Sequence, residues 1–304
     1  MSIFEKAFEK QGQEENSKPY TPQRNSHESG IIEDVVARAE REDATRSEGH
    51  ATDHSSFRGQ KIDLDLEQLQ VAGIINPQAN KANRIADEFR RVKRPLLMNA
   101  KGQGASLVDN ANMIMVTSAL AGEGKTFTSI NLAMSIAMEM DKTVLLVDAD
   151  VAKPDVTKRL GIEAEKGLID VLLGEGVSLQ DVLIRTNIPK LTLLPSGRRH
   201  VHATELLASD AMQKIGQELS TRYSDRIVLF DSPPLMVTNE ARVLASLMGQ
   251  IVLVVEETRT PQPVVKEALS MVESSEIVGV VLNKGQQHDS ADYYAGYGYY
   301  GYGR

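Results

Sequence analysis

The chain contains no cysteine and no tryptophan among its 304 residues. Without cysteine it can form neither a disulfide framework nor a thiolate metal site. It has no apolar run near the roughly 20 residues that span a bilayer, and its first ten residues, MSIFEKAFEK, lack the long apolar stretch of a signal peptide. These absences predict a protein that is made and kept in the cytoplasm.

An excess of positive charge is also missing. The chain has 34 Lys and Arg residues against 42 Asp and Glu residues, a formal net charge of −8. That balance argues against general nucleic-acid binding. The length and the 41% hydrophobic fraction fit one large α/β domain with tails better than two equal domains.

The first segment, residues 1–60, is poor in apolar residues and carries 12 acidic against 8 basic side chains. Such a composition buries too little apolar surface to offset the entropy of ordering, so we expect a largely disordered acidic segment. Two short helical patterns, at residues 3–8 and 31–36, are either docking motifs or transient helices. The folded domain is expected over residues 61–288 and a tail over residues 289–304.

A glycine-rich loop, residues 118–126, lies between a predicted strand at 113–116 and a predicted helix from Lys125. Its glycines can turn consecutive N–H groups toward one anion, and the helix directs its positive end to the same place. The pattern G-x-x-x-x-G-K-[ST] is met except at its first position, Ala119. The alternative, an ordinary strand–helix turn, explains the flanking elements less well. The predicted nucleotide-binding residues are Ala121, Gly122, Glu123, Gly124, Lys125, Thr126 and Phe127.

Continuous aliphatic runs alternate with helical patterns along the rest of the chain. This alternation predicts a P-loop NTPase fold with a mostly parallel, doubly wound sheet, whose ligands bind beyond the carboxyl ends of the strands. The predicted strands are residues 143–147, 191–194, 227–230, 251–255 and 277–282. The predicted helices are residues 78–93, which Pro95 should end, 156–160, 168–173, 203–223, 241–247 and 263–272.

Aspartates follow two of the predicted strands: Asp148 and Asp150 after the first, and Asp231 after another. Magnesium prefers oxygen ligands and usually binds through one or two carboxylates plus phosphate. We therefore expect Thr126, Asp231 and one of the other two aspartates to hold Mg²⁺, with Asp148 assigned to the metal. The remaining carboxylate, for which we favour Asp150, would act as the base in phosphoryl transfer. Lys125 and the three aspartates are the predicted catalytic residues.

Two further features have both a structural and a functional interpretation. Glu88, Arg91 and Arg94 are spaced three apart on a predicted helix, either as a solvated stripe or as a contact surface. Residues 291–304, ADYYAGYGYYGYGR, hold six of the eight tyrosines, separated by glycines, and we expect them to be mobile. This tail is either an adhesive aromatic segment or a substrate.

The sequence resembles the bacterial tyrosine autokinases, or BY-kinases, and in particular the soluble ones encoded with exopolysaccharide export systems. Four features carry the resemblance: AGEGKT at 121–126, LLVDADVAKP at 145–154, VLFDSPP at 228–234 and the tyrosine cluster. The spacing of Glu88, Arg91 and Arg94 matches the family's E-x-x-R-x-x-R motif, which implies an oligomerisation contact. The chain departs from the family at Ala152, where an arginine is usual.

The resemblance implies an enzyme that uses ATP and Mg²⁺ to phosphorylate its own tail, in trans within a ring-like homo-oligomer. It implies that Asn283 contacts the nucleotide base. It also implies a membrane-bound copolymerase that controls polysaccharide chain length as activator, a tyrosine phosphatase as a further partner, and a location peripheral to the inner face of the cell membrane. The acceptors would be Tyr293, Tyr294, Tyr297, Tyr299, Tyr300 and Tyr302.

Other functions remain open at this point. One is a P-loop ATPase switch that docks to a membrane partner without tyrosine kinase activity, and another is an inactive scaffold, which the intact Gly-Lys-Thr end disfavours. The related chromosome-partitioning and division-site ATPases carry a signature lysine at the position of Leu120. The leucine disfavours that reading.

Overall fold

The structure is a computed structural model that describes residues 59–79, 84–104, 108–221 and 225–285. Most of the predicted acidic segment, both of its helical patterns and all six tail tyrosines lie outside the described residues. The expected limits of those segments stay predictions.

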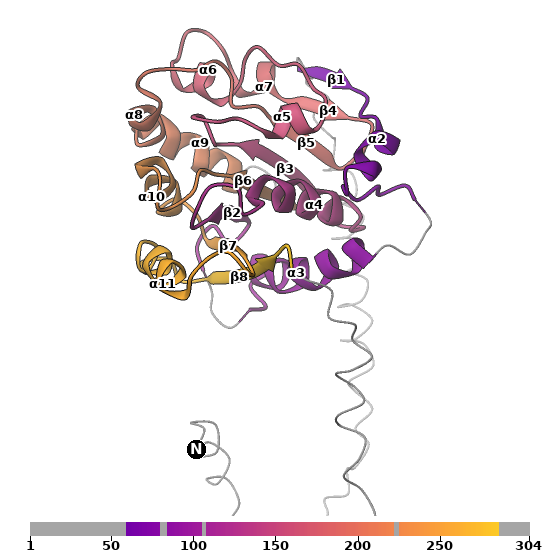
Figure 1. Cartoon of the computed structure of the whole chain (residues 1–304). Coiled ribbons are helices and arrows are strands. Elements are labelled where there is room, and N and C mark those ends of the chain that lie inside the picture. Colours follow the sequence, from indigo (N-terminus) through magenta and orange to yellow (C-terminus); the bar gives the residue numbers. More distant parts are fainter. Residues whose placement is uncertain (1–58, 80–83, 105–107, 222–224, 286–304) are drawn as a thin grey trace, which may run out of the picture. The chain divides into compact units, whose positions relative to one another are not determined.

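The described residues form one eight-stranded sheet in the order β1-β4-β5-β3-β6-β2-β7-β8 (Figure 1). All neighbouring strands pair in parallel except β4 and β5. The predicted mostly parallel, doubly wound sheet is therefore confirmed, although the short strands β1 and β4 were not predicted. The strands are β1 Gln60–Ile62, β2 Met113–Ser118, β3 Thr143–Asp148, β4 Ile184–Thr186, β5 Leu191–Leu194, β6 Arg226–Asp231, β7 Gln250–Glu256 and β8 Val278–Asn283.

The central strands are apolar on both faces because each face has a helical cover. Ile114 and Val116 of β2 belong to one buried core, whereas Met113 and Met115 belong to the other. Side chains alternate between the faces of a strand, so a continuous aliphatic run supplies both cores at once.

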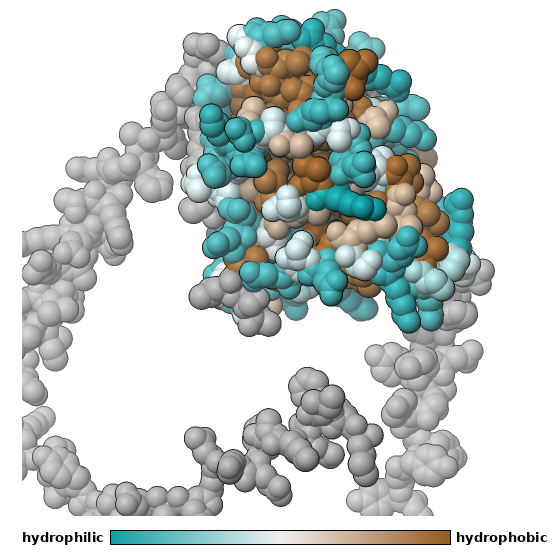
Figure 2. Space-filling model, turned by 90° about the vertical axis from the view of Figure 1, so that its left-hand side faces the viewer, coloured by the Kyte–Doolittle hydropathy of each residue, from teal (hydrophilic) through white to brown (hydrophobic). Residues whose placement is uncertain are grey.

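Helices α2, α3, α4 and α5 contribute to the first core, and α6 to α11 contribute to the second. Figure 1 shows α8, α10 and α11 on the side of the sheet opposite α4. Figure 2 is turned toward that side and shows hydrophobic and hydrophilic residues mixed over its surface. The helices are α2 Leu66–Val71, α3 Arg84–Ala100, α4 Lys125–Ala137, α5 Val156–Arg159, α6 Leu168–Leu172, α7 Leu179–Val182, α8 Ala203–Leu207, α9 Asp210–Thr221, α10 Asn239–Ala245 and α11 Gln262–Ser270.

Among the residues described, no helix combines the length and the apolar character that crossing a bilayer requires.

The prediction of one long helix at 203–223 was wrong, because the chain forms α8 and then α9. Ser209 lies between them, where its hydroxyl donates to the Leu206 carbonyl at 2.7 Å and accepts from the Met212 N–H at 3.4 Å. Leu207 and Met212 are both buried in the second core although they are five residues apart. At 100° per residue one straight helix could not direct both side chains to the same side, so packing favours the break.

The prediction that Pro95 ends its helix was also wrong, because α3 continues through it to Ala100. Leu96 and Leu97 are buried just after the proline. The side chain of Gln250 on β7 joins the last turn to the sheet: its Nε2 donates to the Leu96 carbonyl at 3.0 Å, and its Oε1 accepts from Asn99 at 2.8 Å. These contacts outweigh the roughly 3 kcal/mol that an internal proline costs a helix.

We therefore predict that Pro95→Ala stabilises the domain by about 1–2 kcal/mol, because it restores a backbone N–H to the helix at an exposed position. The greater freedom of the unfolded chain without proline reduces this gain slightly. Urea unfolding at neutral pH measures the change. Met98→Ala, at another exposed position of α3, is the control and should change stability by less than about 0.5 kcal/mol. A destabilised Pro95→Ala variant would contradict this account.

Candidate active site

The predicted phosphate loop connects β2 to α4 and depends on two glycines in left-handed backbone conformations, Gly122 (φ 88°) and Gly124 (φ 98°). Gly124 is the N-cap of α4. A Cβ atom on Gly124 would lie 2.0 Å from Nδ2 of Asn283. The loop therefore requires glycine at 124 both for its backbone angles and for space.

The loop is held from its outer side by side chains at the ends of β7 and β8. Asn283 Nδ2 donates to the Glu123 carbonyl and Lys284 Nζ donates to the Gly122 carbonyl, each at 2.7 Å. The buried Glu123 carboxylate accepts from Leu120 N–H at 2.6 Å and from the Thr260 hydroxyl. With the described residues, the N–H groups of Gly122, Glu123 and Gly124 form no hydrogen bond, so they are available to an anion.

Sequence reasoning included Glu123 only as a member of the loop and missed Lys284 and Thr260. Their positions in the sequence could have indicated them, because both residues follow strands of the parallel sheet at the edge where ligands bind. Asn283 was expected to contact the nucleotide base, and in the structure it lies beside the phosphate loop. Whether it touches a base stays a prediction.

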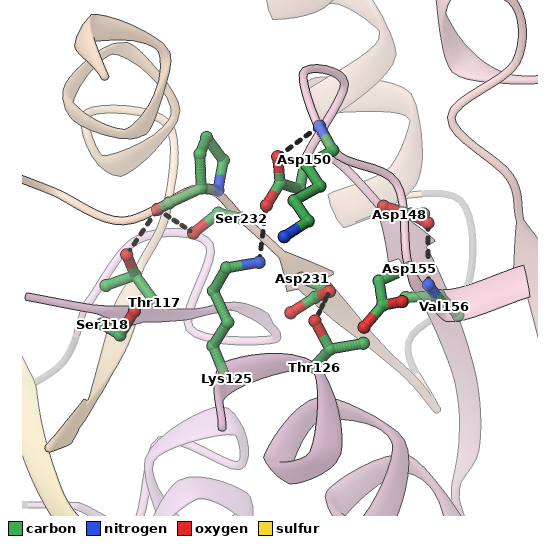
Figure 3. A network of polar contacts seen from close by, with 12 residues as sticks. Thr117, Ser118, Lys125, Thr126, Asp148, Asp150, Asp155, Val156, Asp231 and Ser232 are labelled. Carbon is green, nitrogen blue, oxygen red and sulfur yellow. Dashed lines mark hydrogen bonds and ion pairs between the residues drawn. The ribbon is translucent and has the colours of Figure 1, made fainter. Parts of the chain in front are cut away.

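Lys125 and Asp150 form an ion pair of 2.6 Å, and their side chains are only 11% and 5% exposed. Figure 3 shows Asp150 pointing toward Lys125. Burial lowers the pKa of Lys125, but the carboxylates of Asp231 and Asp150 raise it by more, so the net pKa is raised. Lys125 is therefore held as a cation at the end of the phosphate loop, where α4 begins.

Asp231, at the end of β6, is fully buried and bonded to two hydroxyls of α4. Its Oδ2 accepts from Thr126 Oγ1 at 2.8 Å and its Oδ1 from Ser129 Oγ at 2.9 Å. Burial raises its pKa, while Lys125 and both hydroxyls oppose that shift. The Thr126 contact, visible in Figure 3, brings together two residues that the sequence assigned to the metal.

Asp148 lies directly opposite Asp231, because the two residues are paired in the register of β3 and β6. Its Oδ2 accepts from the Val156 N–H at 3.1 Å, whereas its Oδ1 is buried with no hydrogen-bond partner among the described residues. Burial, and next the nearby charge of Asp231, raise the pKa of Asp148 to about 8.

These residues fit a magnesium ion bound together with phosphate. The donors are carboxylate and hydroxyl oxygens, and Asp148 has a buried oxygen that a cation would satisfy. Over the described ranges no three His, Cys, Asp or Glu side chains are close enough to hold a metal alone. Magnesium needs only one or two carboxylates when phosphate and water complete its shell, so Thr126, Asp148 and Asp231 remain the predicted ligands.

The predicted oligomerisation residues lie outside this site, on α3. Glu88 accepts from Arg84 Nε at 2.8 Å on the same helix. Arg91 and Arg94 are exposed and form no ion pair with the residues that the structure describes. The two arginines are therefore available to a partner.

Comparisons with known proteins agree with this geometry. Residues 111–262 match the family model described as an AAA domain. The chain is 34% identical over 247 residues to tyrosine-protein kinase YwqD of Bacillus subtilis (strain 168), covering 80% of this chain and 94% of that protein. It is 28% identical to tyrosine-protein kinase CpsD of Streptococcus agalactiae over 75% of this chain and 95% of that protein. The crystal structure of the chimerical protein CapA2B2 is similar with a TM-score of 0.60 and 26% identity, covering 75% of this chain and 94% of that one.

We predict that Asp148→Asn stabilises the nucleotide-free chain at pH 8. Between the unfolded pKa of 3.8 and the folded pKa of about 8, the folded chain keeps a proton on Asp148 that the unfolded chain has released. The proton bound to Asp148 therefore stabilises the folded chain fully below pH 3.8, and this stabilisation is lost as the pH rises from 3.8 to about 8. Asparagine stays neutral and can still accept from Val156, so the variant should gain at least about 1 kcal/mol at pH 8.

Urea unfolding in EDTA at pH 8 and pH 5.5 measures this gain, which should shrink at the lower pH. Asp141→Asn removes an exposed carboxylate and is the matched control, with no such pH dependence. Equal stability of the Asp148→Asn variant and the natural chain at pH 8 would show that Asp148 is not destabilised by burial.

Proposed function

The chain belongs to the bacterial tyrosine-protein kinase family, and we propose that it transfers the terminal phosphate of ATP to tyrosines of its own C-terminal segment. The observation that carries this proposal is a phosphate loop whose partly buried Lys125 lies beside the buried Asp150 and Asp231, in a chain that also holds six clustered tyrosines. The fold alone would serve any P-loop enzyme. The tyrosines give it an acceptor.

The loop binds the triphosphate through its free N–H groups and the positive end of α4. Lys125 then lies between the phosphate chain and Asp150, so its charge offsets that of the outer phosphates. Magnesium held by Thr126, Asp148 and Asp231 would supply further positive charge to the transferring phosphoryl group. Asn283 lies beside the loop and contacts the base in this proposal.

Tyrosine is a poor nucleophile at neutral pH because its free pKa is about 10. In the proposed step the phenol oxygen bonds to the terminal phosphorus, the bond from that phosphorus to the bridging oxygen breaks, and ADP leaves. The phenol proton passes to a carboxylate, for which Asp150 is the candidate. Phosphotyrosine and ADP are the products.

The acceptor is proposed to belong mostly to a neighbouring copy in a ring that Glu88, Arg91 and Arg94 of α3 help to form. The 19 residues after Gly285 span up to roughly 60 Å when extended, which is enough to cross between subunits. Each phosphate adds about −1.5 to −2 charges, so modified tails repel one another and the ring separates.

Control of exopolysaccharide synthesis and chain length follows in this proposal from the assembly cycle. A membrane-bound copolymerase would activate the kinase and keep it at the inner face of the cell membrane, and a tyrosine phosphatase would reset it. The domain limits proposed are residues 1–60, 61–288 and 289–304.

We predict that Lys125→Met lowers phosphotyrosine formation at least about 100-fold, because a donor aimed at the transferring group is lost. Mass spectrometry of the tail after incubation with Mg-ATP measures it. Lys214→Met removes an exposed cation of α9 and should leave labelling unchanged. Labelling that persists in Lys125→Met would assign the activity to another site, and ATP hydrolysis without phosphotyrosine in the natural chain would select the ATPase switch.

We also predict a change in assembly. The unmodified chain should sediment as a multi-subunit species and become a single subunit after treatment with Mg-ATP. Lys125→Met should stay assembled under both conditions because its tail gains no charge. Analytical ultracentrifugation compares the two proteins, and an unchanged mass for the natural chain after full phosphorylation would contradict the cycle.

A further inference from the structure

A groove of about 690 Å³ runs along α3, apart from the nucleotide site. One wall is a stripe of α3 at helical spacing, and the other is the carboxyl end of α4 with Met138 and Glu139. Its charged lining residues on α3 and directly after it are Asp87, Arg90, Arg91, Lys93, Arg94 and Lys101, the last of which follows the helix.

The groove is strongly cationic in a chain whose net charge is −8, with five basic and two acidic lining residues. The acidic residues are already neutralised: Asp87 pairs with Arg90, and Glu139 pairs with the buried Lys93 at 2.6 Å. Arg91, Arg94 and Lys101 are exposed and have no ion-pair partner within the described ranges. These three cations carry the excess charge of the groove.

The same groove has apolar surface beside the cations. Met98 and Met138 line it with 51% and 37% of their surfaces exposed, and Leu97 completes this part. Methionine packs adaptably and makes favourable contacts with aromatic rings, whereas arginine pairs with phosphate through two parallel hydrogen bonds. The combination suits a ligand in which a phosphate is attached to an aromatic ring. Free phosphate and acidic side chains have no such ring.

We propose that this groove binds phosphorylated tyrosines of the chain's own C-terminal segment, residues 289–304. The inference rests on the proposed function for the origin of the phosphates. The last described strand, β8, packs through Val281 against the core to which α3 also contributes. The 19 residues after Gly285 can cover the distance, since they extend to roughly 60 Å.

Arg91 and Arg94 give this binding a consequence for assembly. They are the residues proposed above to contact a neighbouring subunit, so a phosphorylated segment that occupies them competes with that neighbour. Separation of the ring then depends on occupation of the contact surface as well as on repulsion between tails. Removal of the phosphates frees the arginines and permits reassembly.

The test uses a fluorescent peptide of residues 289–304, phosphorylated at Tyr299 and Tyr300, and the full-length Lys125→Met chain, whose own tail stays unmodified. Fluorescence anisotropy without ATP should show binding at least about tenfold tighter than that of the unphosphorylated peptide. A peptide with phosphoserine at the same two positions should bind at least about threefold more weakly than the phosphotyrosine peptide, because its phosphates are not attached to aromatic rings. Addition of the phosphotyrosine peptide should also lower the mass of an assembled sample.

The double substitution Arg91→Gln and Arg94→Gln should weaken phosphopeptide binding at least about tenfold, a loss of about 1.4 kcal/mol. Lys214→Gln with Lys266→Gln removes two exposed charges from α9 and α11 and should leave binding unchanged. Thermal unfolding of both variants checks that the exposed substitutions leave the fold intact.

Three results would overturn the proposal. The first is equal affinity for the phosphorylated and unphosphorylated peptides, and the second is an equal loss of affinity in the two double variants. The third is displacement of the phosphopeptide by an equal concentration of an acidic peptide of residues 28–43, which would assign the groove to the N-terminal segment. Because no turnover is involved, each of these results would leave the proposed kinase activity intact. Loss of activity in Lys125→Met likewise says nothing about the groove.

Discussion

Three buried aspartates, Asp148, Asp150 and Asp231, lie around the partly buried Lys125, so the carboxyl edge of the sheet carries more negative than positive charge. Asp148 and Asp231 are neighbours in the strand register, and Lys125 reaches Asp150 from the start of α4. An ionised carboxylate is costly in a dry environment, so burial raises the pKa values of Asp148 and Asp231. A site of this kind gains most from a ligand that brings both positive charge for the acids and phosphates for the lysine.

The order of the strands makes this concentration of charge possible. β2 lies between β6 and β7, so the loop that follows it emerges beside Asp231 on one side and beside the end of β7 on the other. The same parallel direction brings Asn283 to the outer surface of the loop, where it binds the Glu123 carbonyl. The carboxyl edge of the sheet therefore supplies both the aspartates and the side chains that hold the phosphate loop.

Most of the fold and the central residues of the site were predictable because their signals are local. Each central strand is a continuous aliphatic run, and the loop pattern needs only neighbouring residues, as does the pair Asp148 and Asp150. The break at Ser209 and the continuation of α3 through Pro95 were not predictable in this way. Both depend on burial against partners far along the chain, Gln250 in the case of α3. Short strands such as β1 have too few residues for a periodic pattern.

The contacts that hold the loop were missed for the same reason, because the sheet brings Thr260 and Lys284 to the loop from far along the chain. The tail tyrosines, in contrast, were found by composition although they lie outside the described residues. Sequence thus proposed the candidate reacting groups more completely than it predicted the contacts that hold the loop in place.

Lys284 takes a left-handed backbone angle, φ 58°, and its side chain grips the Gly122 carbonyl. The described residues end one position later, at Gly285. Asn283 and Lys284, which end and follow β8, both bind carbonyl groups of the loop after β2. A change in the backbone at the end of β8 would thus act directly on the positions of Gly122 and Glu123.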